Sequence, residues 1–324
     1  MTERLYTLLA DIGGTNTRVA IAEEGAVLPQ SIRRYPNADY PALEPILRDY
    51  LARAEITHLE GACVAAAGPV RDGIATMTNL NWVFGETALA QVLHADRVAV
   101  LNDLQAQGYA LGHLAPDALR EVLPGAPARA GASQLVIGVG TGFNAAPVHD
   151  APGGRVVAPS ECGQITLPAI TDEEIRLRRF IEKTHGFASV EDVLSGRGVA
   201  LIHAFVRAES GQDANPPLTT AEVMTAFAAG DPLAIRTAQI FVRLLGTVAG
   251  DLALVHLPFG GIHLIGGVAR AFAPRLGAFG FTEAFRAKGR FSDFMTAFPV
   301  RVIEDDYAAL TGCAIHLQTS LRVR

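Results

Sequence analysis

Short apolar runs that stop at glycine turns set the pattern of this chain. Apolar residues fill positions 5–10, a polar and glycine-rich stretch follows at 11–16, and strand-like residues resume at 17–22. Two strands around a tight turn predict a β-hairpin. The same order returns at 134–149, where the turn is Gly140-Thr141-Gly142. Two halves that open alike predict a duplicated α/β unit.

Helical periodicity fills most of the remaining chain. Apolar positions recur with helical spacing after Pro41, and further runs predict helices over 86–93, 172–184, 198–208, 220–229, 232–256 and 307–319. Short apolar runs between them predict strands over 31–35, 61–67, 97–101, 262–265 and 300–303. The most apolar stretch, 244–267, is interrupted by polar residues and a glycine pair, so it predicts a buried helix followed by a strand and no membrane span.

Chain length points to more than one domain. With 324 residues, 49% of them hydrophobic, the chain has enough apolar material for two cores. A loop at 124–133 rich in Gly, Pro and Ala separates the halves, but a helix after Asp103 should cross between lobes, which places the boundary near Gly112. We therefore predict a small α/β domain at 1–112 plus 303–324 and a large α/β domain at 113–302.

Charge and cysteine content narrow the function classes. A net charge of -6 argues against a nucleic-acid surface, although backbone N–H groups and a bound metal can still create a local site for ATP. Cys63, Cys162 and Cys313 show no C-x-x-C spacing, so they predict reduced thiols and neither a disulfide framework nor a zinc site. The first residues lack a secretory signal pattern. A soluble, cytoplasmic protein is expected.

Both hairpin turns are candidate phosphate sites. The first is Asp11-Ile12-Gly13-Gly14-Thr15-Asn16, and the second is Gly138-Val139-Gly140-Thr141-Gly142. Such glycines let backbone N–H groups approach phosphate oxygens, the threonines add hydroxyl donors, and Asp11 is placed to hold Mg²⁺ through water. Each turn alone is equally typical of an ordinary hairpin. A dinucleotide fingerprint would need a small residue where Phe143 stands, and no P-loop pattern occurs.

Two further strand ends carry candidate chemistry. Asn102-Asp103 ends the strand at 97–101, where a carboxylate could take a proton from a hydroxyl that attacks a phosphoryl group. On spacing alone, a helix N-cap is the better interpretation of this pair. Gly266-Gly267 ends the strand at 262–265 and could admit an adenosine against bare backbone, or serve only as a helix-entry turn.

Taken together, these motifs resemble one family from end to end. The combination of 11–16, Leu101-Asn102-Asp103, Gly140-Thr141-Gly142, Glu161, 194–198 and 264–268 is similar to the bacterial glucokinase family of the actin and hexokinase superfamily. The resemblance implies an α/β fold of two lobes, each with a duplicated ribonuclease-H-like mixed sheet flanked by helices, and an active-site cleft between them. It also implies transfer of the γ-phosphoryl of MgATP to the 6-hydroxyl of glucose.

The resemblance also implies roles for particular residues. Asp103 matches the catalytic base. The sugar contacts it implies are Asn79, Asn102, Asp103, Glu161, Gln164 and Glu191. The ATP contacts it implies are Asp11, Gly13, Gly14, Thr15, Asn16, Gly140, Thr141, Gly142, Gly266 and Gly267. A homodimer is suggested, and nothing matches the zinc motif of the sister repressor family.

Two departures from the family pattern leave alternatives open. Gln164 stands where the family has His, which puts the sugar preference in question and admits mannose, fructose or an amino sugar. Asn144 stands where the family continues with Gly, which predicts an altered ATP affinity. A non-catalytic sugar sensor of the same fold is the third hypothesis, and the presence of Asp103 with both phosphate turns counts against it.

Overall fold

The computed structural model describes residues 6–77, 80–213 and 216–322. The chain forms two compact units, one made of Met1–Pro116, Pro152–Pro159 and Asp305–Arg324, and the other of Asp117–Ala151 and Ser160–Glu304. The domain limits expected from the sequence, at 112/113 and 302/303, stay a prediction. Each unit is described by itself.

The first unit is built on a mixed sheet with the strand order β3-β2-β1-β5-β9, and β4 also pairs with β2. β1 (Tyr6–Ile12) is antiparallel to β2 (Asn16–Glu23), which confirms the first predicted hairpin. β5 (Gly61–Ala66) lies parallel to β1, and β9 (Val98–Asn102) lies parallel to β5. β3 (Ala26–Val27) and β4 (Arg33–Pro36) extend the antiparallel side.

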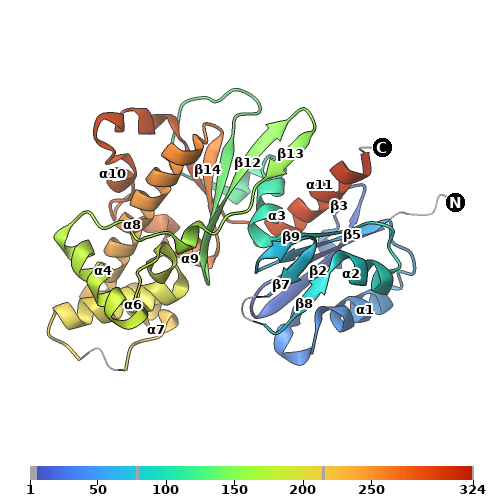
Figure 1. The fold of residues 1–324 in the computed structure, drawn as a ribbon, viewed down its shortest axis with the longest axis horizontal. Coiled ribbons are helices and arrows are strands. Elements are labelled where there is room, and N and C mark those ends of the chain that lie inside the picture. Colours follow the sequence, from blue (N-terminus) through green and yellow to red (C-terminus); the bar gives the residue numbers. More distant parts are fainter. Residues whose placement is uncertain (1–5, 78–79, 214–215, 323–324) are drawn as a thin grey trace. The chain divides into compact units, whose positions relative to one another are not determined.

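Alternate residues of β1 face two different helical layers. Leu8, Ala10 and Ile12 pack in the core beneath α1 (Leu43–Ala54) and α2 (Glu86–Leu93). Leu9 packs on the other face, with α3 (Asp103–Ala110) and α11 (Ala308–Arg322). Figure 1 shows these two layers on opposite sides of the sheet. Since side chains alternate along a strand, a strand buried on both faces reads as the continuous apolar run seen in the sequence.

Smaller strands of the first unit were not predicted. β6 (Val70–Arg71), β7 (Ile74–Thr76) and β8 (Val83–Gly85) form a three-stranded antiparallel sheet. β13 (Gly154–Val157) packs near α3, where the Gln105 side chain donates to the Val157 carbonyl over 3.0 Å. Strands of two to four residues are too short to show a periodicity in the sequence.

The second unit repeats the pairing scheme of the first. β11 (Gln134–Val139) is antiparallel to β12 (Phe143–Ala151), which confirms the second predicted hairpin. β14 (Gly261–Ile265) lies parallel to β11, and β15 (Val300–Ile303) lies parallel to β14. The order β12-β11-β14-β15 therefore matches β2-β1-β5-β9, and β10 (Leu119–Leu123) adds an antiparallel edge. The predicted duplication is confirmed at the level of strand pairing.

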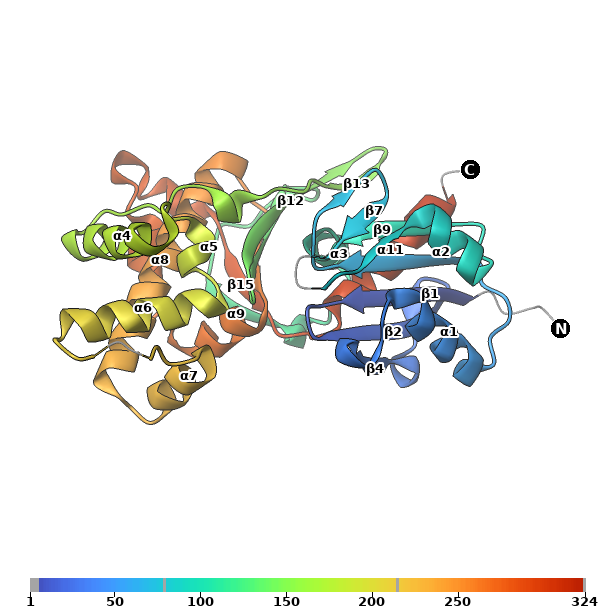
Figure 2. The same cartoon turned by 60° about the horizontal axis from the view of Figure 1, so that its bottom comes forward.

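Helices of the second unit enclose one large apolar core. They are α4 (Asp172–His185), α5 (Val190–Val193), α6 (Gly196–Glu209), α7 (Thr220–Ala228), α8 (Pro232–His256), α9 (Gly267–Phe272) and α10 (Phe281–Arg286). Among the described residues, α8 alone has the length and apolar composition of a membrane-crossing helix, and most of it is buried in the core of this unit. Figure 2 shows it beside α6, as expected for a core helix.

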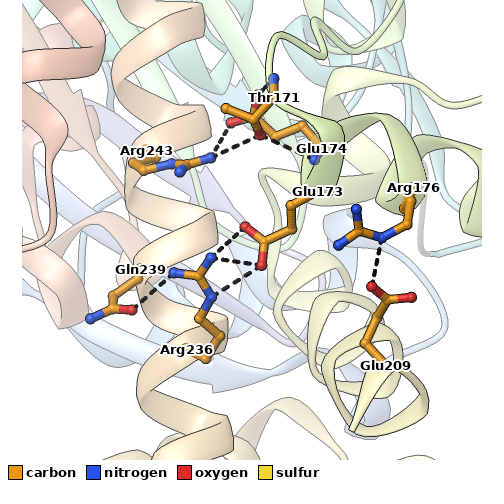
Figure 3. A network of polar contacts seen from close by, with 8 residues as sticks. All are labelled: Thr171, Glu173, Glu174, Arg176, Glu209, Arg236, Gln239 and Arg243. Atoms are coloured by element: carbon orange, nitrogen blue, oxygen red, sulfur yellow. Dashed lines mark hydrogen bonds and ion pairs between the residues drawn. The ribbon is translucent and has the colours of Figure 1, made fainter.

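Two arginines of α8 join that helix to the start of α4 (Figure 3). Arg243 Nη2 lies 2.5 Å from Oε1 of Glu174, whose other oxygen caps the backbone of Ile170 and Thr171. The Glu174 side chain is 5% exposed. Nearby, the Glu173–Arg236 pair is more accessible to solvent. The buried pair therefore combines helix capping with an interhelical contact.

Replacing Glu174 by Gln is expected to lower the free energy of unfolding at neutral pH by about 1–3 kcal/mol. Burial would raise the pKa of this carboxyl, but the backbone N–H groups of Thr171 and Ile170 and the Arg243 guanidinium outweigh burial and lower the pKa. The stabilisation is therefore complete above the ordinary value of 4.5 and is lost as pH falls through the lower folded value.

Denaturant unfolding of the wild type and Glu174→Gln at a series of pH values from 7 to 3 measures this effect. Glu173→Gln is the matched control, and its more exposed pair is expected to contribute less than about 1 kcal/mol. A wild-type advantage over Glu174→Gln that stayed constant down to pH 3 would contradict the assigned pKa direction.

Candidate active site

Parallel strands bring the candidate residues of the first unit to one edge of its sheet. Ile12 pairs with Ala66, and Ala66 pairs with Asn102, so the first glycine turn and the Asn102-Asp103 pair follow strand ends in the same row. The two strand ends are two strand spacings apart, or about 10 Å. The carboxyl edge of parallel strands is the usual location of ligand sites in such sheets.

A buried asparagine braces the first turn. Asn37 donates through Nδ2 to the Gly13 carbonyl over 2.8 Å and accepts from the Thr17 hydroxyl over 2.8 Å. Its backbone N–H donates to the Thr15 carbonyl. Sequence reasoning missed Asn37, because nothing in a single asparagine 24 residues from its partner marks this contact. The turn is thus a supported structure that holds Gly13 to Asn16 in place.

Asp11 is buried at the end of β1 and bound to Arg18. Arg18 Nη1 donates to Oδ2 of Asp11 over 2.9 Å. Burial raises the pKa of the Asp11 carboxyl, and the Arg18 guanidinium offsets only part of that rise. No group of three or more His, Cys, Asp or Glu side chains within the described residues could hold a metal ion. One carboxylate already shared with an arginine suits a contact to Mg²⁺ through water better than direct ligation.

Asn102 and Asp103 both contact the start of α3, but to different extents. Asn102 is the N-cap of α3: its Oδ1 accepts from the Leu104 N–H over 3.0 Å, and Gln105 returns a bond to the Asn102 N–H. Asn102 Nδ2 donates to the Gly68 carbonyl. Asp103 is the first residue of the helix, half-buried, and its Oδ1 also accepts from Leu104. Capping therefore falls mainly to Asn102.

In the second unit, Glu191 braces the second turn. Its Oε2 accepts from the Phe143 N–H over 3.0 Å, and a Cβ on Gly142 would lie 2.6 Å from the same oxygen. The Gly196 N–H donates to the Gly140 carbonyl over 2.7 Å. A capping box of Ser189 starts the helix α5 that carries Glu191. A side chain at position 142 would therefore displace the Glu191 carboxylate.

Three of the predicted sugar contacts lie together in this unit. Gln164 Nε2 lies 3.4 Å from Glu191 Oε1, and Arg197 Nη2 donates to the same oxygen over 3.1 Å. Burial, with a further contribution from the charge of Glu191, raises the pKa of Glu161. Arg197 was not recognised from the sequence as a partner of Glu191. The Gln164 N–H donates to the Glu161 carbonyl over 3.0 Å, so Glu161, Gln164 and Glu191 lie in one polar cluster.

The glycine pair after β14 lies close to the start of the second turn, at Val139 and Gly140. Gly266 has a φ of +107°, and a Cβ there would lie 2.3 Å from the Val139 carbonyl oxygen. A Cβ on Gly267 or Gly140 would meet no atom within 4 Å. Gly266 is therefore fixed by the fold, whereas Gly267 and Gly140 are not required by packing. Asn79, the remaining predicted sugar contact, lies outside the described residues.

Each unit thus presents a hairpin turn, a carboxylate and polar side chains, the arrangement of the actin and hexokinase-like class of sugar kinases. The chain belongs to the glucokinase family, because the family model described as Glucokinase matches residues 8–320. The predicted resemblance is confirmed.

Individual relatives agree with this assignment. The glucokinase of Cupriavidus pinatubonensis is 38% identical over 97% of this chain and 92% of its own length, and that of Pseudomonas aeruginosa is 33% identical over 97% and 95%. The crystal structure of a glucokinase from an Antarctic psychrotroph is 31% identical, with a TM-score of 0.86 over 96% of this chain and 98% of that one. A ROK family glucokinase from Streptomyces griseus, solved with glucose and AMPPNP, shares the fold at 20% identity over 95% of this chain and 98% of that one, with a TM-score of 0.64.

Proposed function

We propose that this chain transfers the γ-phosphoryl group of MgATP to the 6-hydroxyl of glucose, giving glucose 6-phosphate and ADP. The observation that carries the proposal is the clustering of Glu161, Gln164 and Glu191 beside a phosphate-type turn, in a chain of the glucokinase family. The relatives named above carry the name glucokinase, and one was solved with glucose and an ATP analogue.

In this proposal Asp103 is the catalytic base. It accepts the proton of the 6-hydroxyl as that oxygen bonds to the γ-phosphorus and the bond from the γ-phosphorus to the bridging oxygen of ADP breaks. Its position at the start of α3 holds the carboxylate at a fixed strand end. The reaction requires Asp103 and the sugar contacts to act on the same glucose molecule.

The nucleotide is assigned to the glycine turns. Gly14, Thr15 and Asn16 in the first unit and 141–142 in the second supply backbone and hydroxyl donors for the phosphates, and 266–267 is assigned to the adenosine. Gly13 and Gly140 shape the turns, because their N–H groups donate to the Asn16 and Gly142 carbonyls. Mg²⁺ enters with ATP as part of the substrate and neutralises phosphate charge. Asp11 would contact it through water.

The sugar is assigned to Asn102, Glu161, Gln164 and Glu191, with Asn79 as a further predicted contact. Carboxylates and amides suit this role because each accepts hydrogen bonds from hydroxyl groups. Gln164 carries no charge, which keeps another hexose as the second candidate substrate. A cytoplasmic location, a homodimer and the absence of a nucleic-acid partner stay predictions.

A coupled ADP-release assay across glucose, mannose, fructose and glucosamine tests the function. Glucose is expected to give the highest kcat/KM. A higher kcat/KM with another sugar would move the assignment to that hexose. No sugar-dependent ADP release with any of the four would favour the non-catalytic sensor.

A further inference from the structure

Asn144 follows the second glycine turn as the second residue of β12, but its side chain bonds to a different segment, 160–162. Its Nδ2 donates to the Ser160 carbonyl and lies 3.3 Å from Oε2 of Glu161. Both donor hydrogens of the amide thus have partners in the segment that carries a proposed sugar-binding carboxylate.

The other end of the amide binds the same segment. Asn144 Oδ1 accepts from the Cys162 N–H over 3.1 Å and from the Ala145 N–H over 2.9 Å. The Ser160 hydroxyl lies 3.0 Å from the same oxygen and 2.7 Å from the Ala145 carbonyl oxygen, to which it donates. One side chain therefore bonds to three consecutive residues, Ser160, Glu161 and Cys162. An amide suits this position because it donates and accepts from a single planar group.

Close packing limits how the segment can move relative to β12. A Cβ on Gly163 would lie 2.1 Å from the Phe143 carbonyl oxygen, so the backbone after Glu161 lies directly against the start of the strand. The short helical turn Cys162–Gln164 follows at once. Gly163 thus packs against β12 on one side of Glu161, and Asn144 bonds to both neighbours of Glu161 and to its carboxylate.

We propose that Asn144 is a positioning residue that orients the Glu161 carboxylate toward the sugar, so that it sets the affinity for the hexose and not for ATP. The inference rests on the proposed function, because it needs Glu161 to bind sugar. It opposes the expectation from the sequence, in which a residue other than Gly at this position alters ATP affinity.

Asn144→Ala and Asn144→Asp are the test variants. Asn144→Ala removes every bond, and Asn144→Asp keeps the acceptor but replaces the donor with a negative charge beside Glu161. Glucose KM, and glucose Kd from calorimetry without nucleotide, are expected to rise on the order of 10-fold in Asn144→Ala and more in Asn144→Asp. ATP KM and AMPPNP Kd are expected to stay within about twofold, since no nucleotide contact is lost.

Controls separate positioning from general damage. His149→Ala changes an exposed residue farther along β12 and is expected to leave both KM values unchanged. Thermal unfolding shows whether each variant is folded at the assay temperature. If Asn144→Ala is not, the isosteric Asn144→Asp carries the test, because it can still accept from the Cys162 and Ala145 N–H groups.

Glu161→Gln, alone and combined with Asn144→Ala, links the inference to the site. The double variant is expected to raise glucose KM by less than the product of the single effects, because Asn144 acts through Glu161. A rise in ATP KM alone, or no change in glucose KM while Glu161→Gln raises it, overturns the role of Asn144. If Glu161→Gln itself leaves glucose KM unchanged, the sugar site of the proposed function fails, and the inference fails with it.

Discussion

Replacing Asp103 by Asn is expected to lower kcat for glucose phosphorylation by about 10²–10⁴-fold, the usual contribution of general-base assistance. Asparagine has the same shape but no basic oxygen, so it cannot take the proton of the attacking hydroxyl. The glucose and AMPPNP dissociation constants are expected to stay within about threefold, because the loss concerns the reacting proton and not the ground-state contacts.

The same substitution is expected to leave the fold intact. An asparagine oxygen can still accept from the Leu104 N–H, as Oδ1 of Asp103 does over 2.9 Å, and Asn102 keeps its own capping bonds. Asp231→Asn is the matched control, since Asp231 caps α8 through the N–H groups of Leu233 and Ala234 and has no proposed catalytic role. Calorimetry measures the dissociation constants, thermal unfolding measures stability, and the coupled ADP-release assay measures kcat. Near-normal turnover of Asp103→Asn would remove Asp103 as the base.

Local sequence signals were sufficient to predict the main helices and strands. The helix predicted over 232–256 has these bounds in the structure, and both hairpins form around their glycine turns. These elements could be predicted because apolar periodicity and glycine turns are signals that lie within a few residues of one another. The duplication followed from the same signals, since each half repeats them in the same order.

Short elements, and contacts between residues far apart in the chain, could not be predicted from the sequence. The helix α5, which carries Glu191, spans four residues, too few to show a period, although Ser189 and Asp192 form a capping box at its start. The bond from Asn37 to Gly13 and the pairing of Glu191 with Phe143 join positions 24 and 48 residues apart. A single sequence carries no signal for which of its polar side chains meet across such separations.

Asn144 shows how a residue can be singled out in the sequence while its contacts are missed. Its departure from the family pattern was visible in the sequence, and proximity to the glycine turn suggested an effect on ATP. In the structure, the strand alternation of β12 turns the side chain to the segment Ser160 to Cys162. The face of a strand to which a side chain points depends on the register of the hairpin, which the sequence alone did not determine.

Replacement by alanine is expected to destabilise the fold at one of the two neighbouring glycines after β14 and not at the other. Gly266→Ala is expected to lower the free energy of unfolding by roughly 2–4 kcal/mol, because a φ of +107° excludes an ordinary side chain and the added Cβ would lie 2.3 Å from the Val139 carbonyl oxygen. Gly267→Ala adds a methyl group where no atom lies within 4 Å, so its stability is expected to change by less than about 0.5 kcal/mol.

Nucleotide affinity is expected to change in Gly267→Ala although its stability does not. If the adenosine packs on the bare backbone at this strand end, the methyl group of Gly267→Ala is expected to raise AMPPNP Kd and ATP KM on the order of 10-fold, with glucose Kd unchanged. Denaturant unfolding and calorimetry measure both quantities on the same samples. Wild-type AMPPNP affinity in Gly267→Ala would move the adenosine away from this glycine, whereas equal losses of stability in both variants would contradict the space found around Gly267.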